Sequence, residues 1–492
     1  MTKYKGKATK TLTRKRAEKL IGEHIVIPDG YSAIGEKAFA NRREIISITF
    51  PSSLVDIGYG AFYACTSLKD ITIPDSVTKI GEWAFYATAL TNIAVSASVT
   101  KIGECAFVCC NFLADITVNS DNPSYSSQDG ALFNKDKTTL IKIPAEKTGA
   151  YTVPDSVTEL ARYAIDECRL LAEITIPAGI KENLEIDIFN PFDHCMALER
   201  VTIDPDNPSY SSRDGVLFNK DKTTLIFYPP GKTDKTYVIP DTVTKIGVKA
   251  FEGNPYFTSV TIPDSVKKIE SKAFSDCTGL TEMFIPASVE HIHQYVFSHC
   301  NALKVLTISG DNPNYTSEHK VLFNKDKTVL IEYSDREAED DYIIPGSVKS
   351  IDWFAFCGCK SLKSVVIPEG VKHIGMHAFE GCSGLTEIML PSTMTLIDHD
   401  TFSKCSNLRK ITIPDSITEI DIGPVIEAYP FYGCHPEAVA SYKGKTYKAV
   451  NLVCGYGKPY TNLPEDFYEA FNQTPPDPNT FTIVVSICSG ES

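Results

Sequence analysis

The residues of this chain that could take part in the most kinds of chemistry are its cysteines, because thiolates bind soft metals, attack electrophiles and form disulfides. Of the 15 cysteines, most share one position of a repeated segment: Cys65, Cys110, Cys168, Cys195, Cys277, Cys300, Cys359, Cys382, Cys405 and Cys434. Asn254 takes this position once, so it accepts a small, mostly buried side chain that donates weakly to turn carbonyls. We interpret the column as structural free thiols rather than metal ligands, which fits a reducing compartment or an anaerobic habitat.

Other groups that resemble catalytic or metal sites are incomplete. His291 and His293 flank one inward position and are predicted to be solvated. Asp398, His399 and Asp400 are predicted to form a polar turn, because the repeat places no nucleophile beside them. There is no G-x-S-x-G and no H-E-x-x-H segment. We therefore expect no catalytic residue, no metal and no cofactor, and the sequence predicts a protein that is not an enzyme.

A third group of residues could bind a partner without catalysing a reaction. In each repeat, one residue between two inward aliphatic residues points outward: Thr49, Thr72, Thr117, Thr175, Thr202, Thr261, Thr307 and Thr412. The strand preference of β-branched residues explains threonine here. Phe284, Val366 and Met389 take the same position and would expose apolar side chains to water. We predict that the second half of this column, about residues 282–412, holds the main binding contact.

All these positions follow from a repeat of mostly 23 residues. Its most regular mark is an Ile-Pro dipeptide or a close relative, as at Pro51, Pro74 and Pro263. In the segment Leu68–Pro74, aliphatic residues alternate with polar ones, as in a strand with one buried face, and the proline ends the strand. The unit continues with V-T-x-I-G-x-x-A-F-x-x-C, whose apolar residues one unit cannot bury alone. The sequence therefore predicts a leucine-rich-repeat solenoid, mostly strand and loop with short helical turns.

Three near-identical inserts lengthen the repeat. They begin NPSYSSQDGALFNKDK at Asn122, NPSYSSRDGVLFNKDK at Asn207 and NPNYTSEHKVLFNKDK at Asn312. Two apolar runs around the polar NKDK segment predict a β-hairpin in each, near 120–144, 205–230 and 310–334. The hairpins could protect a sheet edge or grip a ligand, and we favour the structural role.

The two ends of the chain depart from the repeat. The predicted domains are a basic leader or cap at 1–20, the solenoid at 21–434, and a C-terminal cap and tail at 435–492. A solenoid needs caps because each end exposes core and unpaired strand edges. We expect a short helix over 13–21 at the first coil, and a hairpin over 442–453 and a short helix over 464–471 after the last one.

The repeat and the insert at Asn122 resemble the BspA-like leucine-rich-repeat proteins of bacteria that live with animal hosts and of some protists. The resemblance covers about residues 21–434. It implies a curved superhelix with a parallel sheet on its concave face. It also implies a surface location and binding to host or bacterial proteins. The sequence has no evident signal peptide, which together with many free thiols favours the cytoplasm instead.

The charge distribution limits the partners. The net charge is −14, and basic residues such as Lys3, Lys10 and Arg16 gather in the first twenty positions. The remaining body is acidic and would repel phosphate backbones, so nucleic acid is not expected as a partner. No apolar run is long enough to span a membrane. We expect a monomer that binds a protein, of host or of its own cell, or a glycan, through the concave face. The alternative is a surface adhesin or structural surface repeat of a host-associated microbe.

Overall fold

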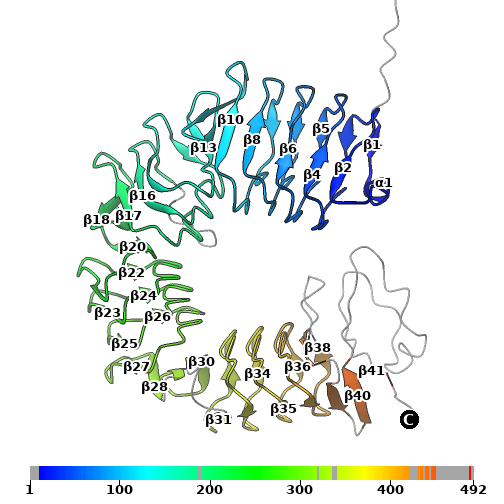
Figure 1. Cartoon of the computed structure of the whole chain (residues 1–492). Helices are drawn as coiled ribbons and strands as arrows, with labels where there is room; N and C mark the ends of the chain where they lie inside the picture. Colours follow the sequence, from blue (N-terminus) through cyan, green and yellow to red (C-terminus); the bar gives the residue numbers. More distant parts are fainter. Residues whose placement is uncertain are drawn as a thin grey trace, which may run out of the picture. The chain divides into compact units, whose positions relative to one another are not determined.

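The predicted repeat solenoid is confirmed. The computed structural model describes residues 10–182, 184, 191–318, 321–334, 341–420, 430–431, 433–435, 438–442, 445–449 and 487–488. The chain divides into two compact units, Met1–Thr233 and Asp234–Ser492, and each is described by itself. Both units stack coils with three sides (Figure 1): a primary strand with the alternating aliphatic pattern, a short secondary strand, and a turn centred on phenylalanine, which we call the Phe turn.

The primary strands run parallel and pair in short sheets of two or three neighbours along the stack. In unit 1 they are β2 (His24–Val26), β4 (Ser47–Thr49), β6 (Asp70–Ile71), β8 (Asn92–Val95), β10 (Asp115–Val118), β14 (Gly149–Thr152), β16 (Leu171–Ile176) and β17 (Arg200–Ile203). In unit 2 they are β21 (Thr236–Val238), β23 (Ser259–Thr261), β25 (Glu282–Ile285), β27 (Val305–Ile308), β31 (Asp341–Ile343), β33 (Ser364–Val366), β35 (Glu387–Met389), β37 (Lys410–Thr412) and β39 (Val439–Tyr442). Two of these short sheets are β2-β4-β6 and β14-β16-β17. Equivalent residues face each other, as Ile174 and Val201 do, so each column of the repeat becomes a row across strands.

The secondary strands contain two residues each and also pair in parallel. In unit 1 they are β1 (Thr11–Leu12), β3 (Ala33–Ile34), β5 (Asp56–Ile57), β7 (Lys79–Ile80), β9 (Lys101–Ile102) and β15 (Glu159–Leu160). In unit 2 they are β22 (Lys245–Ile246), β24 (Lys268–Ile269), β26 (His291–Ile292), β32 (Ser350–Ile351), β34 (His373–Ile374), β36 (Leu396–Ile397) and β38 (Glu419–Ile420). A glycine often comes directly after the secondary strand, because the backbones of neighbouring coils approach closely at that position. A Cβ on Gly81 would lie 2.6 Å from the carbonyl carbon of Gly58.

The Phe turns connect neighbouring coils by hydrogen bonds that run forward along the chain. The amides of Lys37, Phe39 and Asn41 donate to carbonyl oxygens of the next coil at 2.7–2.8 Å. The phenylalanine rings stack nearly parallel, with 5.3 Å between the centroids of Phe39 and Phe62. This stack, the inward isoleucines and the buried leucines form the core.

The first coil is joined to the sheet by residues that precede the predicted solenoid boundary at 21. Strand β1 pairs with β3. The helix expected over 13–21 is limited to α1 (Arg14–Ala17), whose Ala17 is fully buried. The guanidinium of Arg42 donates to the carbonyl oxygens of Ala17 and Leu20 at 3.1 and 2.8 Å, which fixes this segment on the first Phe turn.

At the other end, β39 forms an antiparallel hairpin with β40 (Lys445–Ala449), which pairs with β41 (Ile487–Cys488). This agrees with the hairpin expected over 442–453, although its first strand begins earlier. The predicted short helix over 464–471 lies outside the described residues, as do the basic residues of the leader up to position 9.

Each insert contains three strands instead of the predicted two. They are β11 (Tyr125–Gln128), β12 (Ala131–Asn134) and β13 (Thr139–Lys142), then β18 (Tyr210–Arg213), β19 (Val216–Asn219) and β20 (Thr224–Phe227), then β28 (Tyr315–Glu318), β29 (Val321–Asn324) and β30 (Val329–Tyr333). The first strand is polar and therefore has no apolar pattern to reveal it. The last strand is part of the solenoid, because β13 and β30 pair in parallel with the secondary strands β15 and β32.

The asparagine that opens each insert has the same structural role in all three copies. The Nδ2 of Asn312 donates to the carbonyl oxygens of Pro286 and Val289 at 3.1 and 2.9 Å, and its Oδ1 accepts the amides of Asn314 and Tyr315 at 2.9 Å. Asn122 and Asn207 make equivalent sets of bonds, and all three side chains are fully buried. The insert is thus held to the preceding coil by an amide that bonds at both ends.

Two buried charged residues complete the backbone hydrogen bonding where an insert replaces a Phe turn. The carboxylate of Glu332 accepts the amide of Phe297 from the preceding coil at 3.1 and 3.2 Å. The ammonium of Lys142 donates to the carbonyl oxygens of Tyr163 and Asp166 in the following coil at 3.1 and 2.7 Å. An insert next to a Phe turn removes backbone partners, and these side chains substitute for them.

We predict that Asn312→Ala destabilises the fold. The substitution removes the amide from four backbone groups in a buried place, and one unsatisfied buried group costs about 1–3 kcal/mol. The urea midpoint of unfolding should fall clearly. Asn314→Ala, two residues away, removes only one exposed hydrogen bond, to the carbonyl oxygen of Glu290, and should cost less than about 1 kcal/mol. Equal midpoints for both variants would contradict this role.

Glu332→Ala should also lower the free energy of unfolding by about 1–3 kcal/mol, because the amide of Phe297 loses its acceptor. Glu318→Ala, in the same insert but on an exposed side chain paired with Lys327, is the control and should cost less than about 1 kcal/mol. The hydrogen-exchange rate of the Phe297 amide measures the loss of this acceptor directly and should rise in Glu332→Ala. Unchanged exchange there in Glu332→Ala would show that the carboxylate is not its acceptor.

Candidate interaction surface

The predicted outward column is exposed along the primary strands. Thr49, Thr72, Thr117, Thr202, Thr261 and Thr307 are exposed, while Thr175 and Thr412 are half-buried. Their neighbours one position before and after point into the core, as the pleat of a strand requires. Strand pairing places the column side by side, so that Thr175 lies directly opposite Thr202. The structure thus shows that the row points outward and which members are neighbours, while its role in binding stays a prediction.

Three apolar members of the row lie on consecutive strands of unit 2. Ile343 on β31 faces Val366 on β33, and Met389 takes the same position on the next strand, β35. Their side chains are 72%, 54% and 64% exposed. We call Ile343, Val366 and Met389 the apolar strip. Paired strands are about 4.8 Å apart, so Ile343 and Val366 are direct neighbours. The amide of Thr386 donates to the carbonyl oxygen of Lys363 at 3.1 Å, which places the coil of Met389 next to that of Val366.

The sequence prediction included Val366 and Met389 but missed Ile343. It also missed Val26 and Val238, which take the same position on β2 and β21 and are exposed. All three stand two residues before an aligned proline, at Pro345, Pro28 and Pro240. Alignment on the proline, instead of on the I-T-I pattern, would have identified them.

Phe284 belongs to a separate patch. It faces Thr307 across the pair β25–β27. Val305, two residues before Thr307 on the same face of β27, is 50% exposed, and Phe284 is 53% exposed. The third insert follows β27, and the hydroxyl of Ser317 in that insert accepts the amide of Ile308 at 3.2 Å. The insert therefore covers the free side of β27 and separates Phe284 from the apolar strip along the chain.

Polar residues border the apolar strip on both sides. Two positions earlier on the same strands, the hydroxyl of Ser364 donates to Asp341 at 2.7 Å. Glu387 of β35 lies 3.4 Å from Lys410 on the next strand, β37. Beyond the prolines, Glu369 accepts hydrogen bonds from the amide and hydroxyl of Ser392 at 2.9 and 2.7 Å. These bonds hold the pKa of the exposed Glu369 carboxyl below its usual range. An apolar centre with a polar, mostly acidic rim is the composition of many protein interfaces.

The cysteine column lies on another side of the coil, in the Phe turns, and faces inward. Each thiol donates to a backbone carbonyl of the preceding coil, as Cys382 does to Phe356. The Sγ–O distances are 3.0–3.3 Å for Cys65, Cys110, Cys195, Cys277, Cys300, Cys382, Cys405 and Cys434. They are 3.8 and 3.9 Å for Cys168 and Cys359, which follow inserts. All ten are buried free thiols.

Other residues take the cysteine position where the coil differs. Asn254 accepts the amides of Tyr256 and Phe257 at 2.9 and 3.2 Å. The hydroxyl of Thr88 donates to the carbonyl oxygen of Phe85, and Arg42 donates to the N-terminal segment. Residues of this column therefore satisfy backbone groups of neighbouring turns.

These features define a leucine-rich-repeat protein with an exposed strand face. The family model of the BspA type leucine rich repeat region, in six copies, matches residues 32–150, 146–233, 226–329 and 333–435. The chain belongs to this family.

Solved structures similar to this chain come from several bacteria. A leucine-rich repeat protein from Eubacterium ventriosum is 21% identical, with 87% of this chain and 96% of that chain covered and a TM-score of 0.38. A leucine rich cell surface protein from Faecalibacterium prausnitzii is 24% identical, covering 75% and 84%, with a TM-score of 0.34. A leucine-rich repeat protein from Bacteroides ovatus is 20% identical, covering 85% and 83%, with a TM-score of 0.27. No curated protein matches the chain.

Among the described residues, no helix has the length and apolar composition needed to cross a membrane.

The column thiols should react slowly in the folded protein. Burial raises the pKa of Cys65 and Cys434 to about 12 and that of Cys110 to about 11, so little thiolate forms at neutral pH. We expect iodoacetamide to label these three cysteines at about pH 7.5 at least about tenfold more slowly in the native protein than in urea, as read by peptide mass spectrometry. The half-buried Cys357 serves as the internal control and should react faster than the column. Equal native and unfolded rates at Cys65 would contradict the burial.

Proposed function

We propose that this chain is a non-catalytic scaffold that binds a partner protein on the primary-strand face of unit 2, with the apolar strip at the centre of the contact. The observation that carries the proposal is the adjacency of Ile343, Val366 and Met389 on three consecutive strands, each more than half exposed. The fold gains nothing from keeping three neighbouring apolar side chains in water, because threonine serves elsewhere in the same row.

The border of the strip supports a protein partner of a particular character. The rim carries Asp341, Glu387 and Glu369 against Lys410, and the whole chain has a net charge of −14. A partner with apolar side chains surrounded by basic residues would complement this surface. The strip is small compared with a typical interface, so the rim and the adjacent threonines would contribute complementarity while the strip supplies most of the binding energy.

A glycan partner is the second candidate, and one observation favours it. The primary-strand face also presents hydroxyl and carboxylate groups in regular rows, such as Thr307 opposite Phe284 and Glu282 two residues before it. Polar groups of that kind bind sugar hydroxyls, with aromatic residues stacking on the rings. Phe284 is an exposed aromatic residue of this face, in the separate patch with Val305. A glycan would therefore depend on Phe284 and not on the apolar strip.

We expect the triple variant Ile343→Thr, Val366→Thr, Met389→Thr to lose its protein partner while keeping its fold. Threonine occupies this row in other coils, so the strands should form normally. Partners are captured on the purified full chain from host extracellular material and, separately, from bacterial lysate, and the affinity of a purified partner is then measured. The strip should contribute at least about 1.4 kcal/mol, so the Kd should rise at least about tenfold.

The matched control is Val26→Thr with Val238→Thr, which makes the same change in the same row away from the strip. It should bind with the parent's affinity. Phe284→Thr, together with protease treatment of the captured material, separates the two candidates: a glycan partner survives protease and is lost with Phe284. Unchanged affinity in the triple variant would contradict the proposal.

A further inference from the structure

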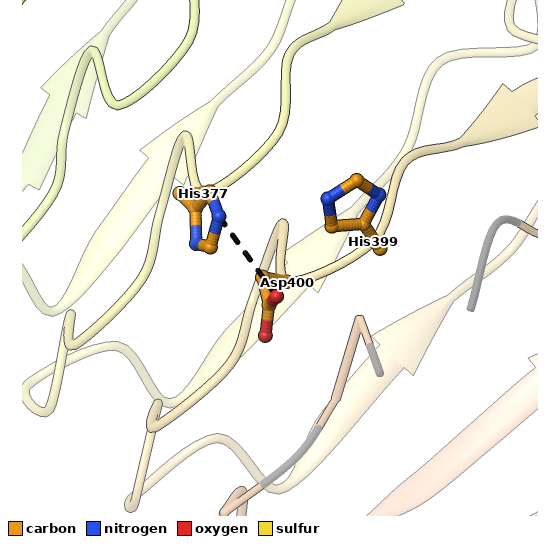
Figure 2. Close-up of side chains that lie close together, drawn as sticks. All are labelled: His377, His399 and Asp400. Carbon is orange, nitrogen blue, oxygen red and sulfur yellow. Dashed lines mark ion pairs between the residues drawn. The ribbon is translucent and has the colours of Figure 1, made fainter. Parts of the chain in front are cut away.

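Two neighbouring Phe turns of unit 2 bring together side chains that can bind a metal ion. His377 follows β34, and His399 and Asp400 follow β36. The amide of Phe379 donates to the carbonyl oxygen of Thr401 at 2.8 Å, which fixes the two turns side by side. One ligand atom from each of His377, His399 and Asp400 lies within 4.8 Å of the others. Figure 2 shows the two imidazoles and the carboxylate converging from the two turns.

The backbone places these side chains on a regular row. His377 and Asp400 have φ angles of 58° and 55°, in the left-handed region, as do Tyr295 and Phe354 at the same position of earlier coils. The ring of His377 stacks on that of Phe354, with 4.3 Å between centroids and 10° between planes. The ring of His399 stands nearly perpendicular to that of His377, at 85° and 5.8 Å. Packing thus holds the His377 ring in one orientation before any ion binds.

A carboxylate fixes which nitrogen of His377 is available. The Nδ1 atom of His377 lies 2.8 Å from Oε2 of Glu380, and Lys404 lies 2.6 Å from the other carboxylate oxygen. With Lys404 donating to one oxygen of Glu380, the other oxygen accepts the Nδ1–H of His377. The Nε2 atom then presents its lone pair toward Asp400. Histidines that bind metals are typically oriented by a carboxylate on the other nitrogen in this way.

Asp400 completes the set with a charged oxygen. Its side chain is 12% exposed, and its Oδ2 lies 3.8 Å from Nε2 of His377, too far for a hydrogen bond. A cation between the imidazoles and the carboxylate would stabilise the buried charge. Tetrahedral ligands at about 2.0–2.1 Å from an ion lie about 3.3 Å apart, a distance that small side-chain rotations from the present positions can reach.

We propose that His377 Nε2, an imidazole nitrogen of His399 and the carboxylate of Asp400 form a binding site for a divalent first-row transition-metal ion of the Zn²⁺ class. Two imidazoles and one carboxylate suit such ions and not the all-oxygen sites of Ca²⁺ or Mg²⁺. Glu380 is a positioning residue that acts through His377. The expectation that the chain has no metal site missed this group, because His377 and His399 are far apart in the sequence and only stacking of the coils joins them.

The site links two coils, so an ion bound there stabilises their contact. Metal that binds only the folded chain raises its apparent stability by RT ln(1 + [M]/Kd), about 2.7 kcal/mol at a hundredfold excess over Kd. This proposal does not depend on the interaction surface, because the Phe turns and the primary strands are different sides of the coil.

The test is a titration of the metal-free full chain, under reducing conditions, with Co²⁺ followed by its visible d–d absorption and with Zn²⁺ by calorimetry. We expect one equivalent to bind with a spectrum of nitrogen and oxygen ligation. His377→Phe keeps the ring stack, since Phe354 already occupies this row, but removes both nitrogens. His377→Phe, His399→Gln and Asp400→Asn should each weaken binding at least about tenfold, and Glu380→Gln roughly 10–100-fold.

Three further measurements test whether these residues, and not different ligands in the chain, bind the ion. His291→Gln with His293→Gln, exposed histidines of the same unit, should leave the affinity unchanged. Cys357→Ser should leave the Co²⁺ spectrum unchanged, whereas loss of a thiolate band in that variant would show that a cysteine is the ligand and overturn the proposal. Zn²⁺ should raise the Tm of the parent but not of His377→Phe, whose fold is verified by circular dichroism without metal. Undiminished binding in both His377→Phe and His399→Gln would also overturn it.

Discussion

Stacking of the Phe turns is the constraint on which the rest of the molecule depends. Each coil donates backbone amides forward to carbonyl oxygens of the next, as Phe39 does to Ala61, so a coil needs its neighbour to satisfy its own turn. A buried amide or carbonyl without a partner is costly, and every departure from the repeat therefore needs a substitute. The buried Glu332 and the buried Lys142 are two forms of that substitute, whereas the cysteine column satisfies a carbonyl oxygen in the regular coil.

The same constraint explains why the chain can vary on one side and not on another. The Phe turns and inward strand positions are fixed by contacts above and below, whereas the outward row of the primary strands contacts only neighbours in its own sheet. Threonine can therefore be replaced there by Ile343 or Met389 without cost to the core. A partner surface can thus evolve on the strand face while the backbone hydrogen bonds are kept. The inserts interrupt that face and divide it into shorter segments.

The regular rows also create sites that single coils do not contain. In the Phe turns, a row of left-handed residues places side chains of successive coils next to one another, so Phe354, His377 and Asp400 become neighbours. On the primary strands, the row places Ile343 against Val366. In both places, the chemistry is assembled by stacking, at a spacing that the repeat fixes.

Local rules were sufficient to predict the coil. The alternation around Thr72, the proline at 74 and the regular spacing of phenylalanine and cysteine are readable in one repeat, because strand pleat, proline geometry and burial act over a few residues. Which residues meet is determined by contacts between coils. The polar strand at 125–128 forms because it pairs with 131–134, Ile343 joins Val366 through strand register, and His377 meets His399 through stacked turns. No single repeat encodes such pairings, since each one requires the position of a second coil.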